Sequence, residues 1–284
     1  MSVPDDYRAE SRKRWSARAE GWERHRDAWR TGTMPVAAWM IDALDPQPGH
    51  NLIELAAGTG DTGLLAAELV APGGDVIISD FSAEMLAVAR RRADELGVSN
   101  VRFKQIDAET SIDVPAASLD GALCRWGFML TADPESALRE SRRVLRPGAR
   151  LALAAWAAEE ENPWIAVLDG AVAERGLSLP PAVPGAPGQF SAAPEGVIAA
   201  QLEAAGFTEP HVELLAFAMP YASVDDWFKT ELDMSGRFSG ALAEAGDEDV
   251  AAIHAALAAA AERYPGPEGT LAVPALTWVA SAVA

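Results

Sequence analysis

Short apolar runs alternate with amphipathic stretches through the middle of the chain, from Asn51 to Trp156. The apolar runs are NLIELA (51–56), DVIISD (75–80), VRFKQID (101–107), GALCRW (121–126) and RLALAAW (150–156). Between them, apolar residues recur at helical spacing near residues 60–70, 82–96 and 133–145. Strands and helices in this order form βαβ units, so the pattern predicts an α/β fold with a parallel sheet and helices on both faces.

The N-terminal segment is predicted to be helical over residues 5–30, and a second helix is predicted over 34–45. Trp15, Trp22 and Trp29 recur every seven residues, which places the three indole rings on one face of the first helix. These rings can dock the helix onto the core, and they can also roof a ligand pocket. The sequence leaves both interpretations open.

The pattern changes after Trp156. Helices are predicted over 161–175, 194–206 and 223–263, strands over 211–220 and 270–284, and a loop rich in proline and glycine over 177–190. Pro274 lies within the last strand, where it indicates an edge or a bulge because proline donates no hydrogen bond to a neighbouring strand.

Composition and charge narrow the range of functions. The formal net charge of −19 opposes binding to the phosphate backbone of nucleic acids. The sequence has no apolar run of about 18 residues and no apolar signal-peptide core at its N-terminus, so we expect no membrane span. Cys124 is the single cysteine, which excludes disulfide scaffolds and cysteine-based metal sites. We therefore expect a cytoplasmic protein without a metal centre.

A glycine-rich loop, ELAAGTGDTG, follows the first apolar run. Gly58, Gly60 and Gly63 match the G-x-G-x-x-G pattern of a dinucleotide-binding turn, and Asp80 follows twenty residues after Gly60. Glu54 argues against this interpretation, because a carboxylate just before the turn would oppose a pyrophosphate. Burying an unpaired carboxylate costs several kcal/mol, so Glu54 favours a ligand that carries an ammonium group and no phosphate.

This segment resembles the first motif of the class I S-adenosylmethionine-dependent methyltransferases, an acidic residue followed by a loop of small residues. Here the motif runs from Glu54 to Gly60, and Ala56 stands where the family has its first glycine. The resemblance is strongest to the small-molecule group that acts in ubiquinone and menaquinone biosynthesis. It implies a Rossmann-like, doubly wound sheet of seven mostly parallel strands with the last strand antiparallel, and S-adenosyl-L-methionine as the cofactor. Gly63 would then be a helix-packing glycine.

Further motifs of this family follow at the ends of the later strands. FSAEML after Asp80 resembles D-x-S-x-x-M-L, which implies that Asp80 takes the ribose hydroxyls and that Phe81 and Met85 flank the adenine. The end of the third strand implies Asp107 at the adenine amino group, and the end of the fourth places the backbone near Arg125 by the sulfonium. The residues implied to bind the cofactor are Glu54, Ala56, Gly58, Thr59, Gly60, Asp80, Phe81, Met85, Asp107, Ala108, Glu109 and Arg125.

On the resemblance, we expect one methyltransferase domain over residues 1–284. Its parts would be an N-terminal helical lid (1–45), a cofactor-binding core (46–160), and helical or loop insertions that cap the core (161–190 and 221–265). The acceptor would be a small molecule, methylated on oxygen, carbon or nitrogen by in-line displacement. A homodimer is possible.

Aromatic residues near strand ends and on the predicted lid are candidates for the acceptor pocket, with plain core packing as the alternative for each. They are Trp15, Trp22, Trp126, Phe128, Met129, Trp156, Trp164 and Trp227. His25 lies on the predicted lid and is the one histidine that we consider as a general base. Arg125 either lies near a carboxylate of the cofactor or substrate, or forms a structural salt bridge.

Two other functions remain open at this level. A protein of this fold and cofactor could carry out cyclisation or ligand binding without methyl transfer. The glycine pattern alone would also fit an NAD-dependent oxidoreductase, although no group suited to hydride transfer stands out in the sequence.

Overall fold

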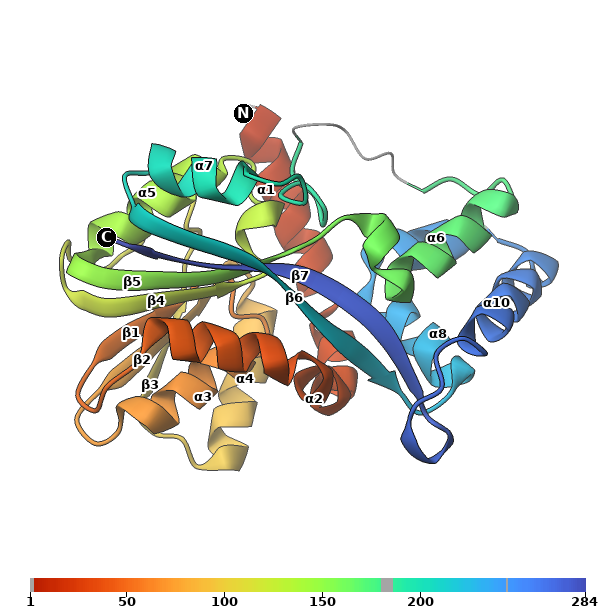
Figure 1. Cartoon of the computed structure of the whole chain (residues 1–284), viewed down its shortest axis with the longest axis horizontal. Coiled ribbons are helices and arrows are strands. Elements are labelled where there is room, and N and C mark those ends of the chain that lie inside the picture. Colours follow the sequence, from red (N-terminus) through yellow and green to blue (C-terminus); the bar gives the residue numbers. More distant parts are fainter. Residues whose placement is uncertain (1–2, 180–185, 244) are drawn as a thin grey trace.

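The computed structural model describes residues 3–179, 186–243 and 245–284. Its centre is a seven-stranded sheet in the order β3-β2-β1-β4-β5-β7-β6, in which β7 runs antiparallel to both of its neighbours (Figure 1). The strands are β1 (Asn51–Glu54), β2 (Asp75–Asp80), β3 (Val101–Gln105), β4 (Leu119–Arg125), β5 (Leu145–Trp156), β6 (Thr208–Tyr221) and β7 (Leu271–Val283). The predicted fold class is therefore confirmed.

Helices cover both faces of the sheet. In Figure 1, α5 and α7 lie on one face, and α2, α3 and α4 lie on the other. The helices are α1 (Val3–Ser16), α2 (Ala19–Leu44), α3 (Asp61–Val70), α4 (Ala83–Leu96), α5 (Pro134–Val144), α6 (Pro163–Glu174), α7 (Val197–Ala204), α8 (Val224–Met234), α9 (Gly236–Leu242) and α10 (Asp247–Ala261), with short 3-10 helices at Phe128–Leu130, Glu159–Glu161 and Pro267–Gly269.

Side-chain caps fix where the core helices begin. The Ser82 hydroxyl accepts a hydrogen bond from the backbone N–H of Met85 at the start of α4. Asp133 caps α5 in the same way, and Pro134 occupies the first turn, where its missing N–H costs nothing. Because α4 starts directly after β2, its cap holds the carboxyl end of that strand in place.

The N-terminal helices differ from the prediction. The break falls at Ala17–Arg18, between α1 and α2, and α2 then continues through Pro35 as one helix of 26 residues. Packing overrides the cost of the proline, since Val36 and Met40 beside it are fully buried against the core. The single helix over 5–30 and the separate helix over 34–45 are therefore corrected to a short helix followed by a long one.

A glycine near the start of α2 lets this helix approach a neighbour closely. A Cβ atom on Gly21 would lie 2.5 Å from the carbonyl oxygen of Asp233 in α8. Such a distance is far inside van der Waals contact, so a side chain at this position would force the two helices apart.

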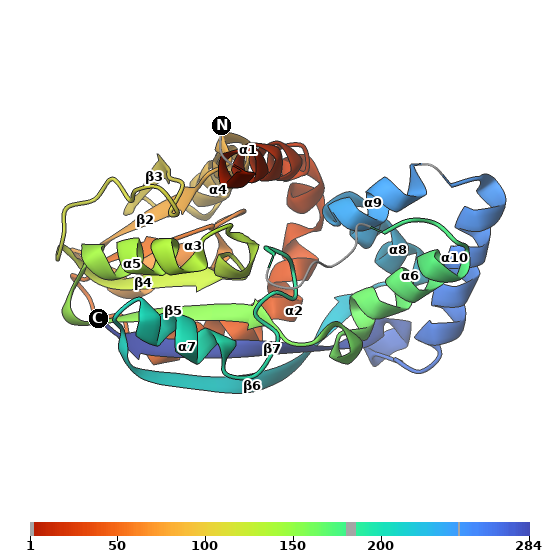
Figure 2. The same ribbon diagram turned by 90° about the horizontal axis from the view of Figure 1, so that it is seen from above.

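A helical lobe stands beside the sheet and is formed by α6, α8, α9 and α10. Strands β6 and β7 extend beyond β5 as a two-stranded antiparallel ribbon and reach into this lobe (Figures 1 and 2). Pro274 lies in that extension. There β7 pairs with β6 alone, because pairing with β5 does not extend beyond Thr277. The predicted edge position of Pro274 is thus confirmed. Part of the predicted loop over 177–190 lies outside the described residues.

The lobe buries ionisable side chains away from solvent. The hydroxyl of Tyr221 donates a hydrogen bond of 3.0 Å to Glu231, and both side chains are fully buried. Asp169 lies 3.1 Å from the guanidinium of Arg237. Burial raises the pKa of Glu231 to about 8, with Asp169 adding repulsion, so this carboxyl is held in its protonated form at neutral pH.

The buried Glu231 makes the stability of the protein depend on pH. The folded state keeps a proton that the unfolded chain releases above its ordinary pKa of 4.5. The contribution of Glu231 to stability is therefore complete below pH 4.5 and is lost as the pH rises toward about 8. In this range the free energy of unfolding falls by about 1.4 kcal/mol per pH unit. We expect the free energy of unfolding, measured in urea at pH 5.5, 6.5 and 7.5, to decline less with rising pH for Glu231→Gln than for the native chain. Equal slopes would contradict the assignment.

Candidate functional site

A cavity lies at the carboxyl ends of β1, β2, β3 and β4, beneath α1 and the first half of α2. It contains about 1130 Å³ of empty space, its opening to solvent included. The predicted site residues that line it are Trp15, Trp22, Glu54, Ala56, Gly58, Thr59, Asp80, Phe81, Met85, Asp107, Ala108, Glu109, Arg125, Trp126 and Phe128. The sequence motifs therefore converge on one place, at the sheet edge where α/β proteins bind ligands.

Asp80 ends β2 and anchors the glycine loop. Its Oδ2 accepts a hydrogen bond of 2.9 Å from the backbone N–H of Gly58, and its Oδ1 accepts one of 2.8 Å from Ser82. Burial raises the pKa of Asp80 to about 6, which leaves the carboxylate mainly ionised at pH 7.5. Each oxygen keeps a second lone pair, so the carboxylate can also accept hydrogen bonds from a ligand in the cavity.

Two glycines of the loop, Gly58 and Gly60, have different roles. Gly58 has a φ of +54° and no atom within 4 Å of where its Cβ would be, so it leaves the cavity open. Gly60 caps α3 with a φ of +81° and packs against Ala89 of α4, 3.0 Å from the ideal Cβ position. Gly60 does not line the cavity, so its predicted contact with the cofactor becomes a packing role that shapes the loop.

Glu54 at the end of β1 has partners within the protein. Its Oε2 accepts a hydrogen bond of 2.9 Å from the backbone N–H of Gly63, in the first turn of α3. Burial raises the pKa of Glu54 to about 8, and the nearby guanidinium of Arg125 opposes that rise. The helix N-terminus and the arginine thus offset only part of the cost of burial, and a cationic group from a ligand would stabilise the ionised form further.

Gly63 has a contact that the sequence interpretation did not foresee. A Cβ atom here would lie 2.5 Å from Oε2 of Glu54 and 3.2 Å from its Cβ. The glycine thus makes room for a buried carboxylate and donates a hydrogen bond to it, in addition to packing the helix against the sheet.

Arg125 joins three elements beside the cavity. Its Nη1 donates a hydrogen bond of 2.7 Å to Oγ1 of Thr33 in α2, and its Nη2 lies 3.4 Å from Oδ2 of Asp61 in α3. The guanidinium carbon lies 5.1 Å from the ring centre of Trp126. The structural salt bridge considered for Arg125 is present, and the side chain also lines the cavity.

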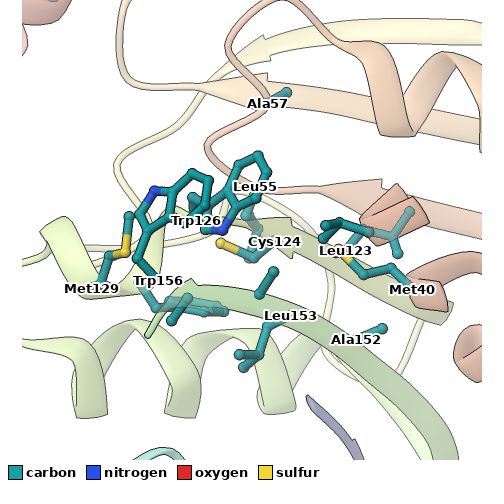
Figure 3. Packing of buried hydrophobic residues seen from close by; sticks show 14 of the residues in the cluster. Met40, Leu55, Ala57, Leu123, Cys124, Trp126, Met129, Ala152, Leu153 and Trp156 are labelled. Carbon is teal, nitrogen blue, oxygen red and sulfur yellow. The ribbon is translucent and has the colours of Figure 1, made fainter. Parts of the chain in front are cut away.

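Trp126, directly after β4, has an unusual backbone held in place by its side chain. Its φ of +58° is in the left-handed region, which costs a bulky residue about 1–3 kcal/mol. The ring stacks on Trp156 (Figure 3), with centroids 4.3 Å apart and planes 4° from parallel. Its Nε1 donates a hydrogen bond to Oγ1 of Thr277. These contacts offset the strain and aim one edge of the indole at the cavity.

Several residues predicted for the acceptor pocket belong to the core instead. Met129, Trp156, Trp164 and Trp227 are buried but do not line the cavity. Trp156 packs between Trp126 and Trp164, and Nε1 of Trp227 donates a hydrogen bond to the carbonyl of Trp164. Their position near strand ends suggested a pocket, but their side chains pack within the hydrophobic core.

His25 also lies away from the cavity. Its Nε2 is 2.9 Å from Oδ2 of Asp233, and its Nδ1 is 3.1 Å from Oγ1 of Thr230. Both partners are on α8, so the imidazole ties α2 to the helical lobe. The structure gives His25 a bridging position and corrects its interpretation as a general base at the cavity.

Helix α1 contributes a wall that the sequence reasoning largely missed. Tyr7, Arg8, Ser11 and Trp15 all line the cavity from this helix. Tyr7, Ser11 and Trp15 follow one another at intervals of four residues, which is the signal that could have placed them on one face. Trp29, which completes the heptad spacing of tryptophans, lines the cavity as well.

Polar contacts hold α1 over the strand ends. Arg8 and Arg12 each lie 3.6 Å from Oδ2 of Asp107, and the Tyr7 hydroxyl donates a hydrogen bond of 3.0 Å to the carbonyl of Leu130. The guanidinium of Arg12 also lies over the ring of Phe81. The arginines of α1 therefore cover the half of the cavity that contains Asp107 and Phe81.

Two searches of the described residues bear on other functions. Across 3–179, 186–243 and 245–284, no group of three or more histidine, cysteine or carboxylate side chains is arranged to hold a metal ion. Within the same part of the chain, no helix combines the length and the apolar character that a membrane crossing requires.

Comparison with known proteins identifies relatives of the central region. The family model described as a methyltransferase domain matches residues 46–178. A ubiquinone/menaquinone biosynthesis C-methyltransferase from Pasteurella multocida is 38% identical over 112 residues, which are 39% of this chain and 41% of that protein. A demethylmenaquinone methyltransferase from Thermus thermophilus is 43% identical over 109 residues, which are 38% of this chain and 48% of that protein. The chain thus spans less than half the length of either relative.

A solved structure supports the assignment of the fold over a longer stretch. The crystal structure of the YcgJ protein from Bacillus subtilis aligns with a TM-score of 0.55 and 23% identity, covering 87% of this chain and 97% of that one. At this level of identity the likeness concerns the fold.

Proposed function

We propose that the chain is an S-adenosyl-L-methionine-dependent methyltransferase acting on a small, flat, apolar acceptor, and the match of residues 46–178 to the methyltransferase domain model supports this. The observation that carries the proposal is the convergence of Asp80, the Gly58 loop and Asp107 on one cavity inside that domain. The names of the two relatives, which describe methylation of quinone precursors, support an acceptor of this kind.

The polar half of the cavity suits a nucleoside better than a pyrophosphate. Asp80 offers a carboxylate to hydroxyl groups, and Phe81 and Met85 present apolar surfaces beside it. Both cavity arginines already face carboxylates, since Arg8 pairs with Asp107 and Arg125 lies against Asp61. A phosphate pair would have to displace these partners, which argues against the dinucleotide interpretation of the glycine motif.

The other half of the cavity is walled by indole rings. The N-terminal helices contribute Trp15, Trp22 and Trp29 to this wall, and the residue after β4 contributes Trp126. Neighbouring rings in this series lie 5.0–5.9 Å apart, so they form a continuous apolar wall. Such a surface recognises a planar apolar molecule through burial and ring stacking.

The residues of this chain position the reactants and exclude water. The bound cofactor supplies a methyl group that is already activated as a sulfonium, so that an acceptor atom can take it by in-line displacement. The tryptophan wall orients the acceptor, and α1 closes the cavity against solvent. Burial raises the pKa of Cys124 to about 12, so its thiol stays neutral and does not compete as a nucleophile. The name of the first relative, a C-methyltransferase, supports a carbon acceptor, which a hydroxyl group on the same ring would activate.

The direct test combines the intact protein with labelled S-adenosyl-L-methionine and a panel of acceptors. The panel contains a naphthohydroquinone, a simple phenol and a primary amine. We expect formation of S-adenosylhomocysteine and a label on carbon of the hydroquinone. Tight cofactor binding without turnover of any acceptor would favour cyclisation or simple ligand binding. Binding of NADH without S-adenosylhomocysteine would overturn the cofactor assignment.

A further inference from the structure

The helical lobe contributes no side chain to the cavity in the described residues. Every lining residue lies between Tyr7 and Thr131, whereas the lobe begins at α6. The lobe nevertheless contacts the N-terminal helices where α1 meets α2. Gly21 packs against Asp233, and the ion pair of Arg24 with Asp233 lies one helical turn further on. Helices α8 and α9 can therefore act on the cavity through this junction.

Arg18 occupies the turn between α1 and α2 and binds α9. Its Nη2 donates a hydrogen bond of 2.8 Å to Oγ of Ser239, and its Nη1 donates one of 3.1 Å to the carbonyl of Arg14. Its Nε is buried without a hydrogen-bond partner among the described residues. Among the described residues, no carboxylate lies within 4 Å of the guanidinium of Arg18. Its position therefore depends on these neutral oxygen acceptors and on steric contact.

Gly236, the first residue of α9, supplies that shape. A Cβ atom on Gly236 would lie 2.6 Å from Cζ of Arg18 and 2.7 Å from its Nη2. The guanidinium therefore lies directly against the backbone of α9, and any side chain at position 236 would displace it. The side chain of Arg18 makes no capping hydrogen bond to α2. Its guanidinium instead joins the carbonyl of Arg14 in α1 to Ser239 in α9, so moving it breaks the link between α1 and the lobe.

We propose that α9 fixes the hinge of the N-terminal lid, with Arg18 as the positioning residue and Gly236 as the surface that holds its guanidinium. In this arrangement the lobe controls how firmly α1 covers the cavity, and so how fast the cofactor product leaves. The lobe thus acts on the site through the hinge, although it forms none of the described walls. The effect on the cofactor product rests on the proposed function, whereas the hinge itself rests on the geometry of Arg18 and Gly236 alone.

The test compares two glycine substitutions in the same short helix of the full-length protein. Gly236→Ala forces the guanidinium away, whereas Gly240→Ala meets no atom within 4 Å and serves as the matched control. We expect Gly236→Ala to speed hydrogen exchange in residues 3–16 and to weaken S-adenosylhomocysteine binding, each by about tenfold. Exchange in β1 to β4 should not change, and Gly240→Ala should behave like the native chain.

A double-variant cycle separates the hinge from a general loss of structure. In an Arg18→Ala background the guanidinium is absent, so adding Gly236→Ala should cause no further change in exchange or affinity. Native-like exchange in Gly236→Ala would overturn the proposal, as would an effect of equal size in the Arg18→Ala background. A native chain that fails to bind S-adenosylhomocysteine would overturn the proposed function, while the exchange measurements would still decide the hinge.

Discussion

Replacing Gly63 by alanine is expected to lower the free energy of unfolding by about 2–3 kcal/mol and to weaken cofactor binding. Alanine should favour a helix by up to about 1 kcal/mol over glycine, but here the new methyl group would lie 2.5 Å from Oε2 of Glu54. Moving a buried carboxylate away from its hydrogen-bond donor costs about 1–3 kcal/mol, and overpacking costs a similar amount. The steric and polar losses therefore exceed the gain in helix propensity.

The matched control for this substitution is Gly170→Ala in α6. Gly170 is also helical, but it is exposed and no atom lies within 4 Å of its ideal Cβ position. Its replacement should leave stability unchanged or raise it slightly in urea denaturation. If Gly63→Ala proved as stable as Gly170→Ala, the contact between Glu54 and the first turn of α3 would be wrongly assigned.

Asp80→Asn is expected to weaken binding of S-adenosylhomocysteine by about tenfold to a hundredfold at pH 7.5. Both carboxylate oxygens accept backbone hydrogen bonds, from Gly58 and from Ser82. An amide group keeps one acceptor and turns two N–H groups toward the other donor, so the glycine loop shifts and the charge that strengthens hydrogen bonds to a ligand is lost. Calorimetry of the two proteins measures the difference directly.

Asp75 provides the control at the opposite end of the same strand. Its side chain is about half exposed and lies 3.8 Å from Arg102, so Asp75→Asn should leave affinity unchanged. Because the pKa of Asp80 is about 6, affinity in the native chain should also fall as the pH drops below that value, and the Asp80→Asn protein should lack this dependence. Equal affinity for the native chain and Asp80→Asn would refute the role of Asp80 in ligand binding.

The predictable part of the site consists of residues next to strand ends in the sequence. Asp80, Phe81 and Met85 could be placed because a strand, a cap and a helix start follow one another within a few residues, and the structure puts all three on the cavity. Local sequence fixes such geometry, since the carboxyl end of a buried parallel strand has one accessible edge.

The aromatic residues show where this reasoning fails. Trp126 follows β4 and Trp156 is the last residue of β5, yet Trp126 lines the cavity whereas Trp156 stacks against it in the core. The difference depends on the left-handed backbone of Trp126 and on contacts with β7, which is more than a hundred residues away in the chain. Sequence spacing carries no signal for either.

The surroundings of Glu54 were only partly predictable for a related reason. The sequence showed that a buried carboxyl group needs a partner, and one partner is the backbone N–H of Gly63, a donor that every residue type except proline has. Backbone donors are invisible in a pattern of side chains. The residue that revealed the arrangement is the glycine opposite, because only the absence of a Cβ leaves space for the carboxylate.

The chain enters and leaves the helical lobe twice. It passes from β5 into α6, returns to the sheet through α7 and β6, goes out again along β6 to α8, α9 and α10, and comes back on β7 (Figures 1 and 2). No single cut in the gene would therefore release the lobe as one fragment. Because α6 and α8–α10 are separate insertions, a recombination event that exchanged the lobe between proteins of this fold would need four crossovers, two for each insertion.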